Sequence, residues 1–309
     1  MSRKIPKNIG ASIRQKLLNL SQQSKQDYNL ILARYAAERF LYRLSRSRYA
    51  SHFILKGALL FSVWMSKPHR PTRDIDLLGL GDLSDDVLTD IIKEVALIEN
   101  EWDGLEFSRE SVTISDIREG HRYHGKRIML GVRLETARMR LQIDVGFGDV
   151  LTPEIKEIEY PAFLDMPGPR IRAYPPTLVV AEKVQAMIVL GLTNSRMKDF
   201  YDLWTMAREF SFNGHELYKA MASTFKRRHT PIPNTLPIPL TDRFANHEDK
   251  IKQWQGFLRR SRLSESSEPL TTVVAYLREF ILPPLHAVAA EQAFSLYWNP
   301  GGPWGEADK

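Results

Sequence analysis

Two carboxylates, Asp74 and Asp76, follow a glycine turn at Lys56-Gly57-Ala58 with apolar residues on both sides. Side chains at positions i and i+2 of a strand point to the same face, so a strand over 73–79 would bring the two carboxylates together. Two such charges repel each other unless a cation lies between them, and Mg²⁺ takes oxygen ligands while keeping positions for substrate phosphates. An isolated Asp-x-Asp is more often a solvated strand end. The glycine turn upstream favours a site for a nucleoside triphosphate and magnesium.

A third carboxylate, Asp144, lies in a segment over 139–147 that alternates well between apolar and polar residues. Leu141, Ile143 and Val145 would form the apolar face of this strand, with Asp144 on the polar face. A two-metal phosphoryl-transfer centre needs a carboxylate of this kind from a neighbouring strand. The alternative is an exposed strand aspartate without a role in chemistry.

A lysine in an otherwise apolar helix forms the second candidate cluster. Lys183 interrupts the helix expected over 178–190, where a lone lysine is costly unless it is paired or its ammonium group reaches the surface. Arg196, Asp199 and Asp202 recur every three residues, roughly on one face of the next helix. One interpretation is a structural salt bridge between adjacent helices. The other is that Lys183 binds triphosphate oxygens as a point charge, and that Asp199 orients it or acts on the acceptor hydroxyl.

The elements that would position these residues follow from periodicity and from turn residues. The pattern predicts an α+β fold, in which a mixed sheet with flanking helices precedes a mainly α-helical C-terminal domain. Thr177 is expected to cap the helix over 178–190, and Ser84 or Asp85 the helix over 85–98. The proline-dense stretch 230–239 reads as an extended linker. Helices are predicted over 9–47 (two), 57–65, 85–98, 178–190, 196–210, 246–262 and 268–293, and strands over 73–79, 105–117, 126–135 and 139–147.

Composition is that of an ordinary globular protein, with 309 residues, 43% hydrophobic and 26% charged. The chain has no cysteine, which excludes disulfides, thiolate catalysis and cysteine zinc sites. The basic N-terminus has no apolar stretch after it, and no window approaches about 18 consecutive apolar residues. We therefore expect no signal peptide, no transmembrane helix and a cytoplasmic location.

The net charge of +6, from 43 basic and 37 acidic residues, permits a polyanionic partner. Basic residues gather in four clusters around the expected phosphate-handling site. Each cluster alone is more often a solvated face, but together they make an RNA or DNA substrate plausible. The clusters are Arg39, Arg43, Arg46 and Arg48; Arg118, His121, Arg122, His124, Lys126 and Arg127; Lys226 to His229; and Arg259, Arg260 and Arg262.

Taken together, these blocks resemble the AbiEii/AbiGii toxin family, a branch of the polymerase-β-like nucleotidyltransferases. The order of the motifs carries the resemblance, together with the Arg-x-Lys-Asp-Phe-Tyr-Asp block, and it covers most of the chain. The matching stretches begin near Tyr35 and run through Leu55 to Ala58, Arg73 to Asp76, Ile143 to Asp149, Ala181 to Lys183 and Arg196 to Asp202, and on to Trp254 and Phe257.

This resemblance implies the toxin of a two-gene toxin–antitoxin or phage-defence system, with a cognate antitoxin as partner. It implies Mg²⁺-dependent transfer of a nucleotide from an NTP to an acceptor hydroxyl, with a tRNA 3′ end as the expected acceptor and a block of translation as the result. The implied domains are N-terminal helices at 1–48, a nucleotidyltransferase core at 49–168, a helical domain at 169–298 and a flexible tail at 299–309.

Residue roles follow from the same resemblance. Metal binding is assigned to Asp74, Asp76 and Asp144, and the essential lysine and aspartate positions to Lys183 and Asp199. Ala58 departs from the Gly-Ser or Gly-Gly of the wider group, and so removes a hydroxyl contact to phosphate. Nucleotide binding is assigned to Lys56, Gly57, Ala58, Arg73, Lys183, Arg196 and Asp202, with backbone N–H groups of Gly57 and Ala58 cradling the triphosphate.

Two other functions fit parts of the sequence. An enzyme of the same fold could act on a small molecule or a protein hydroxyl, and the basic clusters argue mildly against a small-molecule acceptor. A binding module with a dead active site is the second rival, although all the expected polar positions are present. A helix-turn-helix transcription factor fits poorly, because the most patterned segments are the acidic strand and the lysine helix.

Overall fold

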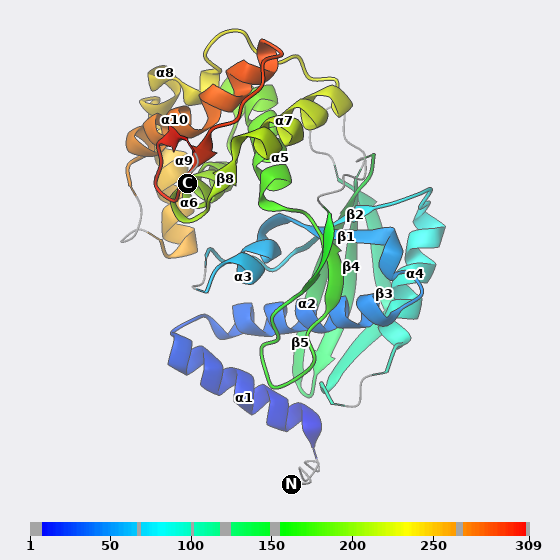
Figure 1. Cartoon of the computed structure of the whole chain (residues 1–309). Coiled ribbons are helices and arrows are strands. Elements are labelled where there is room, and N and C mark those ends of the chain that lie inside the picture. The colour runs from blue at the N-terminus through cyan, green and yellow to red at the C-terminus, as the bar shows by residue number, and fades with distance from the viewer. Residues whose placement is uncertain are drawn as a thin grey trace. The chain divides into compact units, whose positions relative to one another are not determined.

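The computed structural model describes residues 8–66, 69–99, 102–117, 125–148, 155–263 and 268–306. The chain divides into two compact units, Met1–Tyr174 and Pro175–Lys309. The first unit holds the large sheet and the second is mostly helical, which confirms the predicted fold class (Figure 1).

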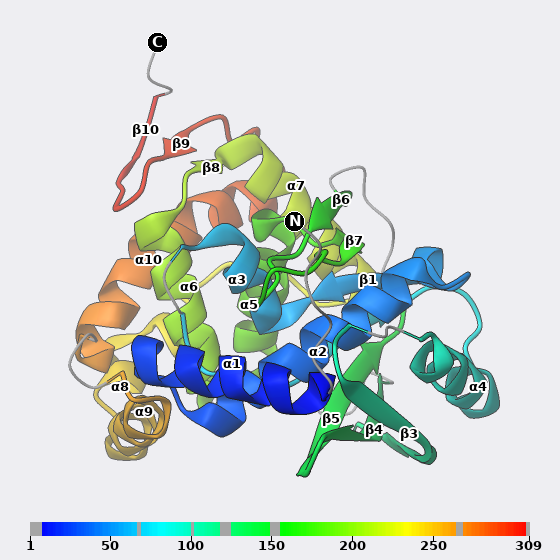
Figure 2. The ribbon, with the colours of Figure 1, turned by 90° about the horizontal axis from the view of Figure 1, so that it is seen from below.

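Two helices open the first unit, as predicted. They are α1 (Ile9–Ser24) and α2 (Tyr28–Arg46), which pack against each other (Figure 2). The side chain of Asn8 caps α1 by accepting from Ala11 N–H, and the side chain of Asp27 caps α2 by accepting from Leu30 N–H. The first helix ends at Ser24 because Lys25 takes a left-handed φ of +54° and its N–H bonds back to the carbonyl oxygens of Ser21 and Gln22.

Within the described residues, seven strands of the first unit form one mixed sheet in the order β3-β4-β5-β2-β1-β7-β6. β2 runs parallel to β5 and β1 parallel to β7, and the other neighbours are antiparallel. The three longest strands match their predicted ranges within two residues, whereas the short strands β1, β6 and β7 were not predicted. The strands are β1 (Phe53–Lys56), β2 (Ile75–Gly79), β3 (Leu105–Asp116), β4 (Gly125–Leu134), β5 (Ala137–Gly146), β6 (Lys156–Glu159) and β7 (Arg170–Ala173).

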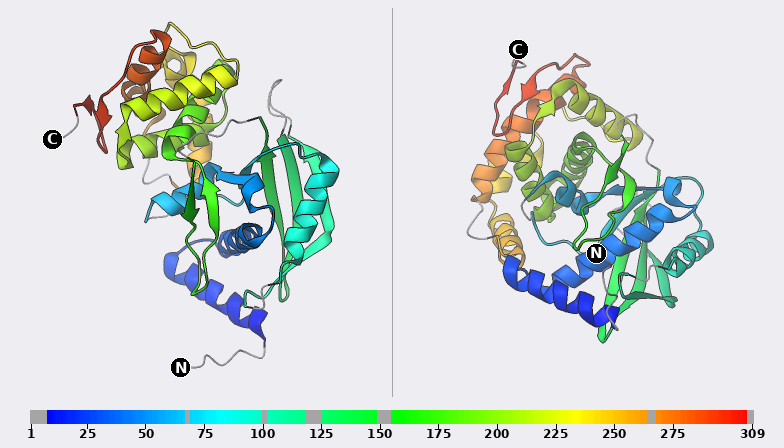
Figure 3. Two further views of the ribbon diagram at one scale, coloured as in Figure 1. Left: turned by 45° about the vertical axis from the view of Figure 1, so that its right-hand side comes forward. Right: turned by 60° about the horizontal axis from the view of Figure 1, so that its bottom comes forward.

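One face of this sheet carries the hydrophobic core of the first unit. Leu77, Ile143 and Val145 are fully buried on it. α2 packs against β5 and β7, and the ring centroids of Phe40 on α2 and Phe107 on β3 lie 5.9 Å apart. α4 (Asp85–Leu97) packs beside β3 (Figure 3), and Ser84 caps it as predicted, since its hydroxyl accepts from Val87 N–H.

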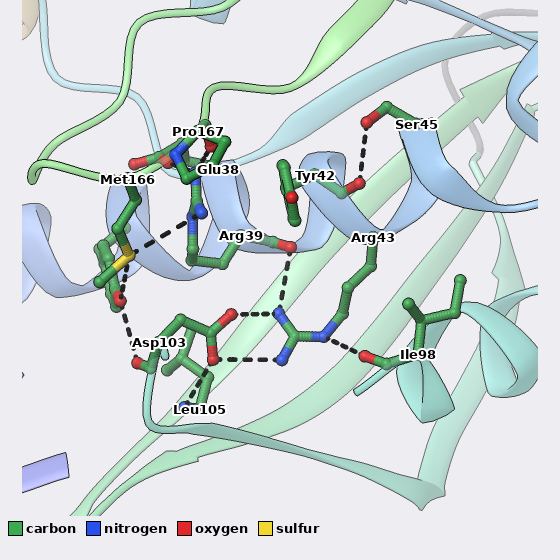
Figure 4. Close-up of polar contacts among 11 residues, drawn as sticks. Glu38, Arg39, Tyr42, Arg43, Ser45, Ile98, Asp103, Leu105, Met166 and Pro167 are labelled. Carbon is green, nitrogen blue, oxygen red and sulfur yellow. Dashed lines mark hydrogen bonds and ion pairs between the residues drawn. The ribbon is translucent and has the colours of Figure 1, made fainter. Parts of the chain in front are cut away.

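A buried ionic cluster lies between α2 and the loop before β3 (Figure 4). Arg43 donates to both carboxylate oxygens of Asp103, at 2.6 and 3.2 Å. Arg39 pairs with Glu38, and both side chains are inaccessible. Burial raises the pKa of the Glu38 carboxyl, and the Arg39 guanidinium opposes this shift. Arg39 and Arg43 are therefore part of the interior, which corrects their assignment to a basic surface cluster.

The segment after β1 differs from the helix predicted over 57–65. A 3₁₀ turn, η2 (Gly57–Leu60), leads into the single helical turn α3 (Phe61–Trp64). Leu59, Leu60 and Phe61 are three consecutive buried residues. Their burial comes from close packing of a short apolar run and not from one face of a regular helix. The tighter turn keeps the backbone of Gly57 and Ala58 next to the ends of β1 and β2.

The second unit is a helical bundle whose main contacts are α5 on α7 and α10 on α6 and α7. The predicted helices are confirmed, but α7 was missed. Its signal is the spacing of Leu217, Met221 and Phe225, all buried, after the capping side chain of Asn213. The helices are α5 (Pro176–Leu190), α6 (Met197–Glu209), α7 (Gly214–Arg227), α8 (Asp242–Ala245), α9 (Glu248–Ser261) and α10 (Leu270–Ala289).

The C-terminal segment is packed up to Glu306, in contrast to the expected flexible tail. The strands β8 (Phe212–Asn213), β9 (Tyr297–Trp298) and β10 (Trp304–Gly305) form a small sheet. Trp298 is fully buried and its indole N–H donates to Ala207 O at 2.6 Å. The Trp304 ring stacks on Phe280 with centroids 5.9 Å apart. Two indoles bury enough apolar surface to order a segment that is rich in glycine and proline.

Two expectations about α5 change. The helix begins at Pro176 after Pro175, so Thr177 lies inside its first turn and does not cap it. The segment Pro176–Thr193 also passes a length-and-composition test for a membrane-spanning helix, with a mean hydropathy of 1.3, and 44% of it is buried inside the protein. The prediction considered only unbroken apolar runs, whereas an averaged window tolerates Glu182 and Lys183. A single such helix, packed on α7, is also typical of a protein core.

Candidate active site

A row of four charged residues crosses the sheet of the first unit. Lys56 on β1 is the register partner of Asp76 on β2, Asp76 of Asp144 on β5, and Asp144 of Arg127 on β4. Register partners point to the same face, which here is opposite the face that carries Leu77, Ile143 and Val145. Neighbouring strands lie about 4.8 Å apart, so the row spans about 14 Å. Two carboxylates therefore lie side by side between two cations.

The glycine turn is tied to this row through Gly57. Its φ of +76° belongs to the left-handed region that glycine favours. A Cβ at this position would lie 2.6 Å from Cγ of Asp76, closer than real contacts allow. Lys56, just before the turn, lies 5.8 Å from the ring centre of Tyr174 and also approaches Gly146. The turn and the row are thus a single packed arrangement in which only glycine fits.

Asp144 lies next to Asp76, as the pattern predicted, but it already has close partners. Arg127 Nε and Nη2 donate to its two oxygens at 2.9 and 2.7 Å, and Gln142 Nε2 lies 3.2 Å from both. The Asp144 side chain is 17% exposed and that of Arg127 is 41% exposed. Both oxygens of Asp144 are therefore engaged, and it could ligate a metal only by exchanging these donors.

Asp74 and Arg73 lie just outside β2. The strand begins at Ile75, so Asp74 precedes it by one residue and is half-buried. The observed strand therefore begins two residues later than the predicted range of 73–79. Arg73 is an exposed side chain whose guanidinium lies 3.9 Å from Oδ1 of Asp27, the cap of α2. Its assigned nucleotide-binding role is compatible with this weak surface pair.

The donor set suits a divalent cation only in part. Among the described residues, no group of three or more histidine and acidic side chains is arranged to hold a metal ion. Asp74 and Asp76 are carboxylates two residues apart, a donor type that suits Mg²⁺, which needs few protein ligands when phosphates supply others. The carboxylate pair of Asp74 and Asp76 is therefore the part of the site that fits Mg²⁺. Asp144 is instead hydrogen-bonded to Arg127.

In the second unit, Lys183 on α5 lies between two aspartates of α6. Its Nζ is 2.5 Å from Oδ1 of Asp199 and 2.8 Å from Oδ2 of Asp202. The three side chains are 14%, 8% and 0% exposed, so water has little access to the cluster. This is the polar network between adjacent helices that the spacing predicted, and it shows why a lysine is tolerated in an apolar helix. Arg196 directly precedes α6, where its N–H donates to the side chain of Asn194 at 2.8 Å.

The basic cluster at 226–229 is largely structural. Arg228 and Arg227 approach Glu182 at 3.0 and 3.5 Å, and both arginine side chains are only 10% exposed. Arg228 also donates to Gln185 at 2.8 Å. These two arginines therefore lie inside the second unit, which corrects their assignment to a nucleic-acid surface. By contrast, Arg259 and Arg260 at the end of α9 are exposed, as predicted for a surface cluster.

The cluster between 118 and 127 divides in two. Arg118, His121, Arg122 and His124 lie outside the described residues. Lys126 lies 2.7 Å from carboxylate oxygens of Asp85 and Asp116. Arg127 was grouped with these basic residues, and its place in the charged row was missed. The available signal was the polar alternation of 125–134 opposite that of 139–147, which places equivalent positions side by side once a hairpin is assumed.

Comparison with solved structures found similar folds at low identity. JHP933 from Helicobacter pylori is 15% identical, with a TM-score of 0.46, over 88% of this chain and 92% of that one. A second H. pylori protein, described as a candidate nucleotidyltransferase, is 14% identical, with a TM-score of 0.45, over 88% of this chain and 94% of that one. A search of curated proteins found no match. These similarities carry no argument about chemistry.

The family model gives the assignment. The model described as nucleotidyl transferase AbiEii toxin, type IV TA system, matches residues 39–279. This range contains the glycine turn, the whole charged row and the lysine cluster. The family implies nucleotidyl transfer, an NTP substrate and a cognate antitoxin. The chain therefore belongs to the AbiEii nucleotidyl transferase toxin family of type IV toxin–antitoxin systems.

Proposed function

We propose that this toxin transfers a nucleotide from an NTP to the 3′ end of a tRNA in the cytoplasm, and thereby blocks translation. The observation that carries the proposal is the register of Asp76 and Asp144 between Lys56 and Arg127, in a chain of this family. Paired carboxylates flanked by cations suit a reaction that handles several negative charges at one phosphate group. A role in phage defence belongs to the same proposal.

In the proposed reaction, the acceptor oxygen attacks the α-phosphorus of the NTP. A new O–P bond forms, the bond between α-phosphorus and bridging oxygen breaks, and pyrophosphate leaves with its electron pair. The acceptor proton passes to a carboxylate, for which Asp144 is the candidate. Because Arg127 and Gln142 occupy both of its oxygens, Asp144 must give up one hydrogen bond to take this proton.

The remaining residues bind and orient substrate in this proposal. Asp74 and Asp76 would hold Mg²⁺, which when bound supplies positive charge that stabilises the negative charge on the phosphates. Backbone N–H groups of Gly57 and Ala58 are proposed to meet the triphosphate. The proposed phosphate contacts come from Lys56, Arg73, Lys183 and Arg196. Asp199 and Asp202 hold the Lys183 ammonium group in one place.

The test uses the purified chain, total bacterial tRNA, Mg²⁺ and each labelled NTP in turn, with Asp76→Asn as the variant. We expect label on tRNA from the parent and a loss of about a thousandfold in the variant, because metal ligands supply several kcal/mol of transition-state stabilisation. Asp86→Asn removes an exposed carboxylate in the first turn of α4 and should keep the parent rate.

Other outcomes would redirect the proposal. Label on the protein fraction would indicate a protein hydroxyl as acceptor. Full activity in Asp76→Asn would show that the site is elsewhere. Retention of tRNA without any transfer of label from any of the four NTPs would favour a binding module.

A further inference from the structure

The charged face of the sheet continues from Asp144 into a groove lined with arginines. Along β5, Arg138, Arg140 and Asp144 are separated by even numbers of residues, and the register with β4 is unbroken. Side chains at such spacings point to the same face of a strand. The groove has a volume of about 770 Å³, and its lining includes Arg133, Arg138, Arg140, Ser108, Ser111 and Gly131.

Gly131 keeps the floor of this groove low. It is the register partner of Arg140, so no side chain stands opposite that guanidinium. The bulge in β3 folds Ser111 over this point. Its Oγ accepts from Gly131 N–H at 2.7 Å and donates to Ser108 O at 2.5 Å. A Cβ at Gly131 would lie 2.8 Å from that hydroxyl oxygen, so a larger residue would displace the bulge.

The groove carries more positive charge than its own residues balance. Arg133 and Arg138 are direct register partners, and like charges in this position destabilise a sheet. Arg133 is paired with Glu106 across β3 and β4. In the part of the chain that the structure describes, no ion pair joins Arg138 or Arg140 to a carboxylate, and both residues are exposed. A polyanion bound in the groove would balance this positive charge.

The spacing fits a chain of phosphates that ends at the charged row. Every second residue of a strand advances about 7 Å, so Arg140 lies about 14 Å and Arg138 about 20 Å along β5 from Asp144. We propose that this groove binds the backbone of the RNA acceptor, with its 3′ end at Asp76 and Asp144 and the preceding phosphates at Arg140 and Arg138. The identification of the acceptor as RNA rests on the proposed function.

The test compares two pairs of exposed arginines of equal charge. Arg138→Gln with Arg140→Gln removes the unbalanced charge of the groove, and Arg208→Gln with Arg243→Gln removes the same charge from exposed positions of the second unit that belong to none of the basic clusters. Binding of total bacterial tRNA is measured between 50 and 200 mM salt, without NTP. For two lost phosphate contacts to single-stranded RNA, the slope of log K against log salt should become shallower by about 1.4 in the groove variant only.

Kinetics provide the second measurement. The groove variant should raise the KM for tRNA about tenfold or more, which is about 1.4 kcal/mol, and leave the KM for NTP unchanged. The unfolding midpoint should not fall, because the two side chains are exposed. An unchanged slope, or an equal change in the variant with Arg208→Gln and Arg243→Gln, would overturn the groove assignment.

The two proposals can fail separately. If the parent binds tRNA but transfers no label, the proposed function fails, and the salt slopes still decide whether the groove binds RNA. If label reaches tRNA and the groove variant matches the parent, the function stands and the groove assignment falls. Loss of cognate-antitoxin binding with unchanged tRNA binding would identify the groove as a protein interface, which would also overturn the assignment.

Discussion

The backbone of Gly57 lies against the side chain of Asp76, so that a Cβ at position 57 would come within 2.7 Å of Cβ and 2.6 Å of Cγ of Asp76. The preceding residue, Lys56, is the register partner of Asp76. The glycine turn is therefore packed directly against the side chain of Asp76. Two residues that lie nineteen positions apart in sequence are thus in direct contact in the fold.

This fit predicts that Gly57→Ala disturbs the position of Asp76. The left-handed φ alone costs a residue with a Cβ about 1–2 kcal/mol, and the overlap with Asp76 adds to this. We expect the free energy of unfolding to fall by about 3 kcal/mol in urea titrations. We also expect nucleotidyl transfer to be lost even where the variant is folded.

Gly81→Ala is the matched control for this prediction. Gly81 has a φ of +86°, but no atom lies within 4 Å of a Cβ at that position. It should lose only the backbone part, about 1–2 kcal/mol, and keep transfer activity. Equal losses of stability and full activity in both variants would show that Asp76 has room to move.

A second prediction concerns the unequal roles of Asp76 and Asp144 in metal binding. Mn²⁺ binding can be followed by electron paramagnetic resonance in the absence of NTP. Asp76→Asn should weaken it by at least about tenfold, because even outer partners of metal ligands are worth 10–100-fold. Asp144→Asn should weaken it much less, since Arg127 and Gln142 already engage both oxygens of Asp144. Equal weakening would show that Asp144 releases Arg127 and ligates the cation.

A third prediction separates the structural role of Lys183 from any role in catalysis. Lys183→Met leaves Asp199 and Asp202 buried without their shared cation, and breaking a buried ionic cluster costs about 3–5 kcal/mol. Thermal or urea unfolding should show this loss. Adding Asp199→Asn and Asp202→Asn should restore most of the stability, because the uncompensated charges are gone.

The exposed pair of Lys252 and Glu248 is the control for the lysine cluster. Its N–O distance is also 2.5 Å, but the side chains are 66% and 79% exposed. Lys252→Met should change the free energy of unfolding by less than about 1 kcal/mol, as for most surface pairs.

Nucleotidyl transfer by the variant with Lys183→Met, Asp199→Asn and Asp202→Asn separates the two roles. If this variant regains stability without regaining transfer, the lysine cluster has a role in catalysis beyond folding.

A fourth prediction follows from the burial of Lys250. Its Nζ donates to Asn194 O at 2.9 Å and lies 3.3 Å from Gln253 Oε1, and the residue is 6% exposed. Burial lowers the pKa of the Lys250 ammonium group, and the charge of Asp249 opposes this shift. Between the lowered pKa and the unfolded pKa of about 10.4, the unfolded chain holds more protons than the folded one. The contribution of Lys250 to the free energy of unfolding therefore increases as pH rises through this window.

Lys250→Met should remove this increase, and Lys252→Met should keep it. The measurement is the urea midpoint at a series of pH values from 7 to about 10.4. An identical pH dependence in the parent and in Lys250→Met would contradict the prediction.

Local patterns were enough to predict several elements of the fold. The two helices over 9–47 and the helix over 85–98 follow from apolar periodicity and from caps such as Ser84. The strand of Asp144 follows from alternation alone. These features could be predicted because period and capping depend on residues a few positions apart. The helix α7 carries the same kind of local signal in the helical spacing of Leu217, Met221 and Phe225.

Long-range pairing decided the rest. The sequence by itself determined the fold class, the family resemblance and the kinds of residue at the site. Only the tertiary structure decided that Arg127 is the partner of Asp144, that Arg43 pairs with Asp103 inside the first unit, and that Arg228 pairs with Glu182. The local sequence pattern around an arginine on a helix or strand is the same whether its side chain faces water or a carboxylate far away in sequence. Strand order and helix packing determine which of the two it meets.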